Sequence, residues 1–167
     1  MTRVLIGGVG YRWQGDASFG LAASDALARE SWPDSVQVAD LGYGALYVTQ
    51  DLSDAHPPYT RLVLLAGVGR GRTPGALYRG EWQPPIATPA EVQERVREAG
   101  AGVIDLDHLL VIASYFGALP ADVVTLEFEP IDLAGADLSP AAAALLPEVL
   151  ARARSEALAP VREAIRA

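Results

Sequence analysis

The first loop of the chain combines side chains that could bind a ligand or take part in hydrolysis. An acid, a hydroxyl and three large side chains stand among glycines in Gly8-Val-Gly-Tyr-Arg-Trp-Gln-Gly-Asp-Ala-Ser-Phe-Gly20. The apolar run before it, residues 3–6, is typical of a buried strand. Asp16 and Ser18 are good N-cap residues for a helix over residues 19–30. This order predicts a site at the carboxyl end of a parallel sheet, where ligands usually bind.

Two nucleotide-binding motifs do not fit this loop. A dinucleotide-binding fingerprint needs a third glycine at the position of Trp13. A P-loop needs Lys and then Ser or Thr after Gly15, but Asp16 and Ala17 follow it. Since a carboxylate at this place repels a phosphate, the sequence argues against a nucleotide site.

The composition leaves few groups for covalent catalysis. The chain has no Cys, and its 13 basic residues are all Arg. Cysteine and lysine nucleophiles, disulfides and zinc-thiolate sites are therefore excluded. There is no G-x-S-x-G elbow, and Ser18 and Ser114 have no evident base partner. A hydrolase with a different mechanism is thus a weaker alternative.

The pattern of apolar segments predicts the elements that hold these side chains. The segment 61–67 is apolar after Arg61, as expected of a central parallel strand covered on both faces. Thr88, Pro89 and Glu91 predict a capping box at a helix start. Strands are expected at 3–6, 35–39, 61–67, 75–81 and 123–128, and helices at 19–30, 45–52, 88–97, 104–115 and from 139 toward 166, with a kink or restart at Pro160.

These elements predict one α/β domain over residues 1–167. It has a mainly parallel, twisted sheet of about five strands with helices on both faces. The net charge of -8 argues against nucleic acid or an anionic membrane as a partner. No stretch has the pattern of a signal peptide or a membrane span. We expect a cytoplasmic protein.

The first loop resembles the opening motif of the nickel-iron hydrogenase maturation proteases, which reads roughly G-[IV]-G-N-x-L-x-x-D-[DE]-x-x-G. Tyr11 stands at the Asn, Asp16 matches the first acid and Ala17 stands at the second. Further segments are similar to family motifs and follow in the family order: 40–44, 70–79, 109–120, 124–130 and 138–140.

The resemblance implies an endopeptidase that trims the C-terminal tail of a hydrogenase large subunit once nickel is in place. It implies that the protein has no cofactor of its own, because members of the family recognise the nickel ion that is bound to the substrate. Family members bind this metal through a carboxylate in the first loop, an Asp after the central strand and a His before the later helix. The matching positions here are Ala17, Ala66 and Gly102. None of them can ligate a metal through its side chain, so the resemblance implies a degenerate site.

Other residues could supply relocated ligands. Asp16 is one position from the first ligand and is the candidate catalytic residue. Asp105 and Asp107 are typical of solvated acids in the first turn of a helix. His108 lies six residues after Gly102, which corresponds to about 10 Å along a helix axis. The sequence leaves open whether these residues form a metal site.

The loops after the first and central strands carry candidates for partner binding. Two aromatic residues and an Arg in the first loop are of the types enriched in binding hot spots. Together with arginines of the later loop, that Arg predicts a positive patch suited to a carboxylate-bearing tail. Asp40 is expected to cap the glycines of its own turn. The partner-binding candidates are Tyr11, Arg12, Trp13, Asp40, Tyr43, Arg70 and Arg72.

Two functions remain open at this point. The first is a maturation-protease-like protein that acts on the large-subunit tail with lost or altered peptidase activity. The second is a non-catalytic binding partner, chaperone or subunit of a hydrogenase or of its maturation factors. The absence of ligand side chains at Ala17, Ala66 and Gly102 is the feature that separates them.

Overall fold

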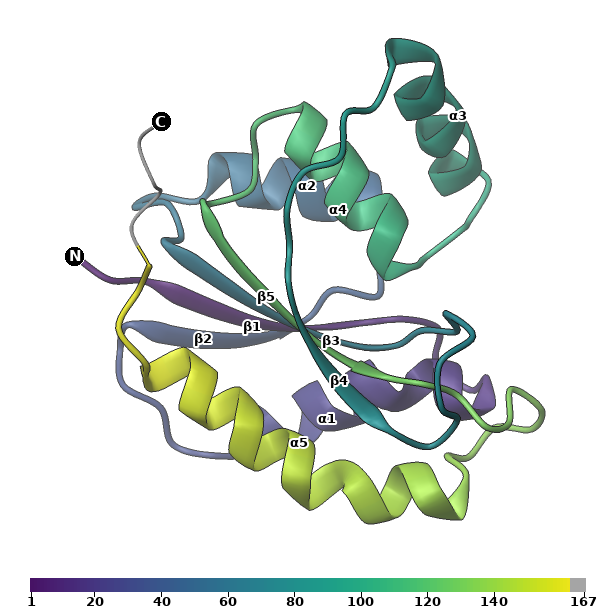
Figure 1. Cartoon of the computed structure of the whole chain (residues 1–167). Helices are drawn as coiled ribbons and strands as arrows, with labels where there is room; N and C mark the ends of the chain where they lie inside the picture. Colours follow the sequence, from purple (N-terminus) through teal and green to yellow (C-terminus); the bar gives the residue numbers. More distant parts are fainter. Residues whose placement is uncertain (163–167) are drawn as a thin grey trace.

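A five-stranded sheet with the order β2-β1-β3-β5-β4 forms the centre of the computed structural model, which describes residues 1–162 (Figure 1). The pairs β1–β2, β1–β3 and β3–β5 are parallel, and β4 is an antiparallel edge strand against β5. The predicted α/β class, with a mainly parallel sheet, is confirmed. The strands are β1 (Val4–Val9), β2 (Val36–Asp40), β3 (Arg61–Gly67), β4 (Leu77–Glu81) and β5 (Asp122–Phe128).

Helices cover both faces of this sheet, as predicted (Figure 1). On one face lie α1 (Phe19–Leu27), which follows the short 3-10 helix η1 (Gly15–Ser18), and α5 (Pro140–Leu158). On the other face lie α2 (Ala45–Asp54), α3 (Pro89–Gly100) and α4 (Leu106–Tyr115). Within residues 1–162, no helix combines the length and the apolar character that a bilayer crossing requires.

The central strand β3 packs into a hydrophobic core on each face. Leu62 and Leu64 belong to the core under α2 and α4. Val63 and Leu65 belong to the core under α1 and α5. Side chains alternate along a strand, so a strand covered on both faces is apolar at every position. This explains why the strongest apolar run of the sequence becomes the middle of the sheet.

The start of α3 and the end of α5 test the helix boundaries that the sequence predicts. The backbone N–H of Glu91 donates to Thr88 Oγ1, and Glu91 accepts from the backbone N–H of Thr88, so the predicted capping box is confirmed. α5 ends at Leu158, so the interruption predicted at Pro160 is confirmed, but residues 160–162 do not restart the helix. Ala159 is extended because it precedes Pro160, which disfavours helical backbone at the residue before it. The rest of the predicted helix, residues 163–166, lies outside the described residues.

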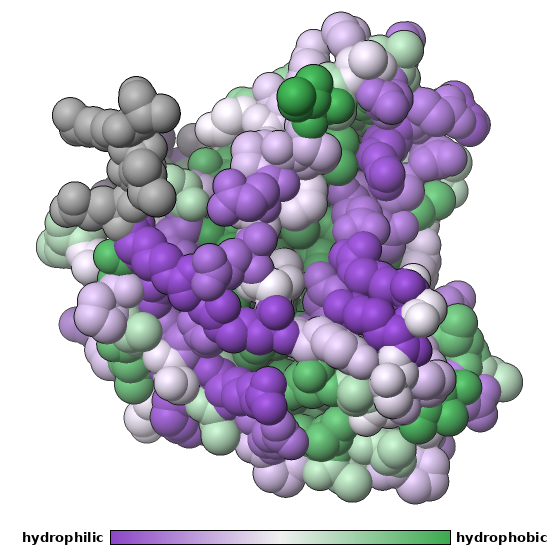
Figure 2. Space-filling view, viewed as in Figure 1, coloured by the Kyte–Doolittle hydropathy of each residue, from purple (hydrophilic) through white to green (hydrophobic). Residues whose placement is uncertain are grey.

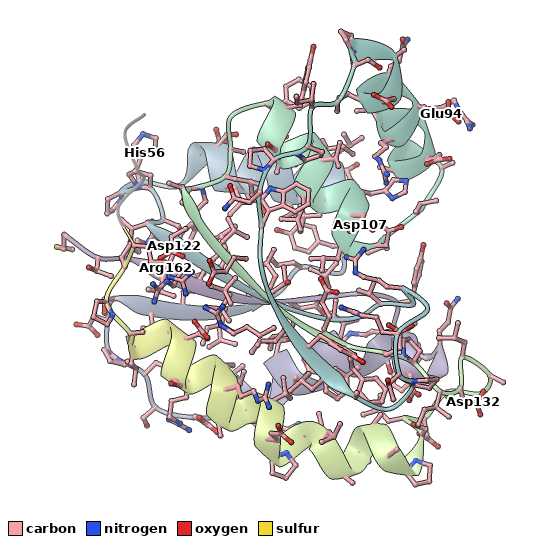
Figure 3. The ribbon with its side chains drawn as sticks, in the orientation of Figure 1. His56, Glu94, Asp107, Asp122, Asp132 and Arg162 are labelled. Atoms are coloured by element: carbon pink, nitrogen blue, oxygen red, sulfur yellow. The ribbon has the colours of Figure 1, made fainter. Side chains whose placement is uncertain are left out.

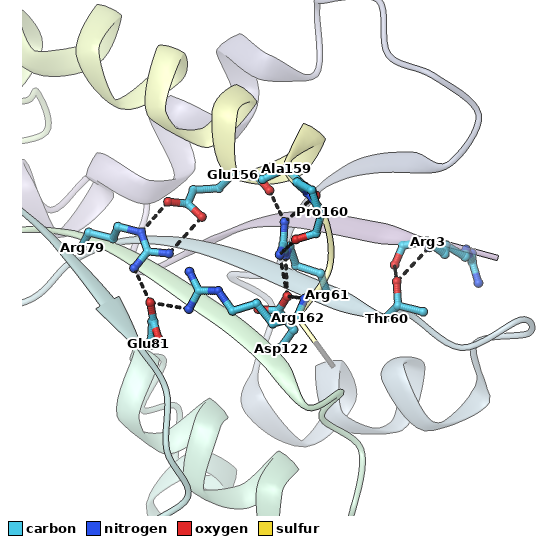
Figure 4. Close-up of polar contacts among 10 residues, drawn as sticks. All are labelled: Arg3, Thr60, Arg61, Arg79, Glu81, Asp122, Glu156, Ala159, Pro160 and Arg162. Atoms are coloured by element: carbon cyan, nitrogen blue, oxygen red, sulfur yellow. Dashed lines mark hydrogen bonds and ion pairs between the residues drawn. The ribbon is translucent and has the colours of Figure 1, made fainter. Parts of the chain in front are cut away.

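A buried arginine holds the chain after α5 against the amino-terminal edge of the sheet (Figure 4). Arg61 and Asp122 are the first residues of β3 and β5, they are paired in register, and both are nearly inaccessible to solvent. Arg61 Nε and Nη2 donate to Asp122 Oδ2 at 2.8 and 2.6 Å. Its guanidinium also donates to the carbonyl oxygens of Glu156, Ala159 and Pro160, at 2.5, 2.9 and 2.6 Å.

Asp122 contributes to the same attachment from the other strand. Its Oδ2 atom accepts a hydrogen bond from the backbone N–H of Arg162 at 2.8 Å. Asp122 and Arg162 therefore lie at one edge of the molecule, while Asp107 and Asp132 lie toward the other (Figure 3). Hydrophilic side chains gather on the surface beside the end of α5 in this view (Figure 2). The amino-terminal edge of the sheet is thus closed by the protein's own chain.

We predict that Arg61→Ala lowers the free energy of unfolding by about 3–5 kcal/mol, because it leaves the buried carboxylate of Asp122 without its cation. Denaturant unfolding measures this change. Arg152→Ala is the matched control, since Arg152 forms an exposed i,i+4 pair with Glu148, and its loss should cost about 0.5 kcal/mol or less. Equal effects of the two substitutions would contradict the stabilising role of Arg61.

Candidate site at the carboxyl end of the sheet

Four loops meet at the carboxyl end of the parallel strands. They are residues 10–18 after β1, 68–76 after β3, 129–139 after β5 and 101–105 before α4. The phenol oxygen of Tyr11 accepts a hydrogen bond from the backbone N–H of Ile104 at 2.7 Å, which joins the first loop to the segment before α4. This edge is where ligands bind in α/β sheets, as the order of the first elements predicts.

The three positions that match the family's metal ligands fall in this region. Ala66 is 2% exposed and its side chain belongs to the core under α2 and α4. Ala17 lies close to the residue that follows Ala66. A β-carbon added to that residue, Gly67, would lie 3.5 Å from the Cα atom of Ala17. Gly102 lies two residues before Ile104 and has a φ of 102°, where a side chain would strain the backbone. The three positions offer two methyl groups and a glycine.

A carboxylate does stand beside the position of Ala66, on the neighbouring strand. Glu127 of β5 pairs in register with Ala66 of β3, so the two side chains leave the same face of the sheet. Glu127 is held by two cations, with Arg70 Nε at 2.7 Å and Arg72 Nη2 at 2.9 Å from its Oε2 atom. Arg70 also contacts both oxygens of Asp107 on α4, at 2.8 and 3.1 Å. A guanidinium therefore bridges β5 and α4 at this site.

A second buried carboxylate fixes the loop that carries the two arginines. Glu129 is 4% exposed and accepts from the backbone N–H groups of Arg70 and Gly71, at 2.8 and 2.9 Å. Arg72 Nε donates to it at 3.0 Å. Burial alone would raise the pKa of Glu129, but the ion pair with Arg72 and the two N–H groups outweigh it and hold the pKa below its usual value. The sequence reading did not predict Glu127 or Glu129 as site residues.

The predicted positive patch is wrong, because carboxylates neutralise each of its arginines. Arg12 pairs with Asp25 at 2.8 Å and with Asp40 at 2.6 Å. Arg70 and Arg72 are paired with the acids described above. The sequence did not reveal this pairing, because the acids that face the arginines lie on other elements, far away along the chain. These three arginines therefore do not form a positively charged surface that is free to bind a carboxylate.

The other partner-binding candidates have different surroundings. Tyr11 is half-buried and holds Ile104, which gives it a structural role in addition to the predicted one. Trp13 is 75% exposed. Tyr43 is 47% exposed and donates to Asp51 at 2.5 Å. The cap predicted for Asp40 is confirmed, since its Oδ1 accepts from the N–H of Gly42 at 2.7 Å.

Asp16, the catalytic candidate, is fully buried and its oxygens are occupied by hydrogen bonds. They accept from the backbone N–H groups of Ile131, Asp132 and Ser139, at 2.9, 3.1 and 2.8 Å, and from the Ser139 hydroxyl at 2.9 Å. Burial raises the pKa of Asp16, but these hydrogen bonds outweigh it and hold the pKa below its ordinary value of 3.8. Asp16 joins the first loop to the loop before α5, and it does not cap α1 as the sequence suggested.

Ser18 occupies the N-cap position of α1 without capping it. The structure shows no hydrogen bond from a backbone N–H of α1 to its side chain, and its hydroxyl donates to the Gly15 carbonyl at 2.6 Å. The first loop is therefore stabilised by contacts with the loop before α5 and by its own turn, which local capping rules do not capture.

The relocated-ligand candidates other than Asp16 make contacts of their own. His108 is 7% exposed, with Nε2 at 2.6 Å from Glu98 and Nδ1 at 2.8 Å from Asp105. Asp105 caps α4 by accepting from the backbone N–H of His108. Asp107 pairs with Arg70. Among residues 1–162 the geometry brings no three His, Asp or Glu side chains together in a way that would hold a metal ion.

Several solved structures with the same fold are hydrogenase maturation proteases. A hydrogenase 2 maturation peptidase from a Thaumarchaeota archaeon is 27% identical, with a TM-score of 0.64 over 93% of this chain and 97% of that one. The endopeptidase HybD from E. coli is 19% identical, with a TM-score of 0.69 over 93% and 91%. The protease HycI from Thermococcus kodakarensis is 20% identical, with a TM-score of 0.65 over 93% and 90%. Neither protein-family models nor curated protein sequences give a match.

The chain is thus a single-domain α/β protein with the fold of the solved hydrogenase maturation proteases. The structural neighbours support the nickel-iron hydrogenase maturation protease family that the sequence motifs indicate.

We predict that Asp16→Asn lowers the free energy of unfolding at pH 7 by about 2–3 kcal/mol, because an amide cannot accept from all four donors. The folded-state pKa is depressed, so the stabilisation is complete above pH 3.8 and is lost as the pH falls through the still lower folded value. Urea unfolding of both proteins between pH 7 and pH 3 should show the difference narrowing at the acid end. Asp54→Asn, at an exposed position, is the control. A difference of the same size in acid would contradict the role of the Asp16 charge.

Proposed function

We propose that this protein is a maturation-protease-like binding partner of a nickel-iron hydrogenase large subunit and does not cleave it through a metal. The observation that carries the proposal is the composition of the carboxyl edge. Ala17, Ala66 and Gly102 stand where the family resemblance requires metal ligands, and Arg70 bridges Glu127 and Asp107 beside them.

The electrostatics of this edge support binding without metal capture. A nickel ion carried by a partner would find no side-chain ligand at Ala17 or at Ala66, which is buried. The carboxylate paired in register with Ala66, Glu127, already has two guanidinium partners. A divalent cation would have to displace Arg70 and Arg72 before Glu127 could ligate it. The residues present therefore fit poorly with a bound metal.

The fold still provides what a binding partner needs. The carboxyl edge retains the loops of the family in the same order, and the ion pairs of Arg12, Arg70 and Arg72 fix those loops in place. A loop fixed before binding loses less conformational entropy when a partner docks. The family's recognition surface can thus persist after its ligands are lost. A maturation factor is the second partner that this reading allows.

We predict that nickel and zinc do not bind at this edge with micromolar affinity. Calorimetric titration of the protein without an affinity tag should show no such site. The chain has only two His, of which His56 is exposed, so His56→Ala controls for adventitious binding. A micromolar site that persists in His56→Ala would contradict the proposal.

The deciding experiment for function is incubation with a nickel-loaded large-subunit precursor. We predict co-migration of the two proteins in gel filtration and an unchanged precursor mass in intact mass spectrometry. Release of a discrete C-terminal peptide would instead show a peptidase with relocated catalytic groups. An unchanged mass without co-migration would contradict binding to this partner.

A further inference from the structure

A surface hollow of about 250 Å³ lies between the first loop, α1 and the loop before α5. It is on the α1 and α5 side of the sheet, whereas Ala66 faces α2 and α4. Small-molecule sites usually measure roughly 300–1,000 Å³, so this hollow is better suited to one or two side chains of a peptide. We call it the Trp13 pocket. Its main lining residues are Trp13, Leu21, Ala22, Asp25, Asp137 and Leu138.

Trp13 has an unusual backbone conformation for such a large residue. Its φ is 63°, in the left-handed region that non-glycine residues rarely adopt, and its side chain is 75% exposed. Such conformations persist where surrounding contacts impose them, and they cluster at functional sites. Here Arg12 is fixed by two carboxylates on one side and Asp16 is buried on the other. The loop therefore presents an aromatic ring to solvent in a fixed place.

The opposite wall of the pocket is held to the same loop. The N–H groups of Gly15 and Asp16 donate to the carbonyls of Gly135 and Asp132, at 2.9 and 2.8 Å. This packing brings the backbone of residues 132–134 against Gly15. The exposed ring of Trp13 therefore stands beside a hollow whose two walls are joined, as is typical of a protein interaction site.

The charges at the pocket favour a basic partner. Arg12 is already neutralised by Asp25 and Asp40. Asp137 is exposed at the rim and makes no ion pair within residues 1–162. The rim is therefore acidic, in a chain whose net charge is -8. A cation beside Asp137 could also contact the ring face of Trp13.

We propose that the Trp13 pocket binds an extended peptide segment of the partner in which a basic side chain adjoins an apolar one. The apolar side chain packs on the half-buried Ala22 and Leu138, and the basic side chain lies between Asp137 and Trp13. The identity of the partner rests on the proposed function, whereas the chemistry of the segment rests on the pocket alone.

The test is an NMR titration of the 17.6 kDa protein with two capped hexapeptides. One alternates Arg and Leu, and the other alternates Glu and Leu. We expect the Arg peptide to bind about tenfold more tightly than the Glu peptide. The indole N–H signal of Trp13 should move, while those of Trp32 and Trp82 stay in place.

Trp13→Gly removes the ring and leaves the left-handed backbone without strain, so the variant should remain folded. It should weaken binding of the Arg peptide about thirtyfold. Asp137→Asn should reduce affinity for the Arg peptide alone. Tyr47→Ala and Asp54→Asn, at exposed positions on α2, are matched controls and should change nothing.

Equal affinity for the two peptides would overturn the proposal that the Trp13 pocket binds a basic segment. Unchanged binding of the Arg peptide to Trp13→Gly would overturn it as well. A precursor that co-migrates equally well with wild type and with Trp13→Gly would overturn it too, while leaving the proposed function intact. Binding of the Arg peptide at Trp13 without co-migration of the precursor would support the proposed role of the pocket. It would contradict the proposal that the partner is a hydrogenase large subunit.

Discussion

The buried carboxylate of Asp16 is the interaction on which the arrangement of the site loops depends. It gathers donors from Ile131, Asp132 and Ser139, which follow β5, onto a loop that follows β1. Strand β3 lies between these two strands, so the contact spans the middle of the sheet. Because the charge is desolvated, it is stable only while every donor is in place, and the donors are ordered only while the charge is there. The start of α5, the wall of the Trp13 pocket and the position of Ala17 all follow from this contact.

A second set of charges organises the other side of the same edge. Arg70 and Arg72 contribute two fixed cations to a place where the family resemblance expects a divalent metal. Both kinds of cation neutralise carboxylates, but a guanidinium is covalently attached to the protein and cannot activate a water molecule. The ion pairs of Arg70 and Arg72 therefore join β5, α4 and the loop after β3 into one charged network at this edge.

Much of the fold was predictable because local patterns and tertiary packing agree. The run from Leu62 to Gly67 is apolar because both faces of β3 are covered, and the Thr88–Glu91 box is a contact within one turn. The site was less predictable because its contacts join distant segments. Nothing near Arg70 in the sequence shows that Glu127 and Asp107 will neutralise it, and nothing near Asp16 shows that residue 139 will donate to it. A signal was available in Glu127 and Glu129, which stand at and just after the carboxyl end of β5. The absence of metal binding at Ala17, Ala66 and Gly102 stays a prediction.

The antiparallel edge strand β4 has a consequence for how the protein behaves among other proteins. An uncovered edge offers free backbone donors and acceptors to any extended chain that comes near, and strand addition of this kind leads to aggregation. On β4, Arg79 forms ion pairs with Glu81 on the same strand and with Glu156 on α5, and Glu81 also pairs with Arg162. An incoming strand would have to accommodate or break these charges, at a cost that backbone pairing must exceed. The ion pairs that join β4 to α5 and to Arg162 therefore also oppose the addition of a further strand to the sheet.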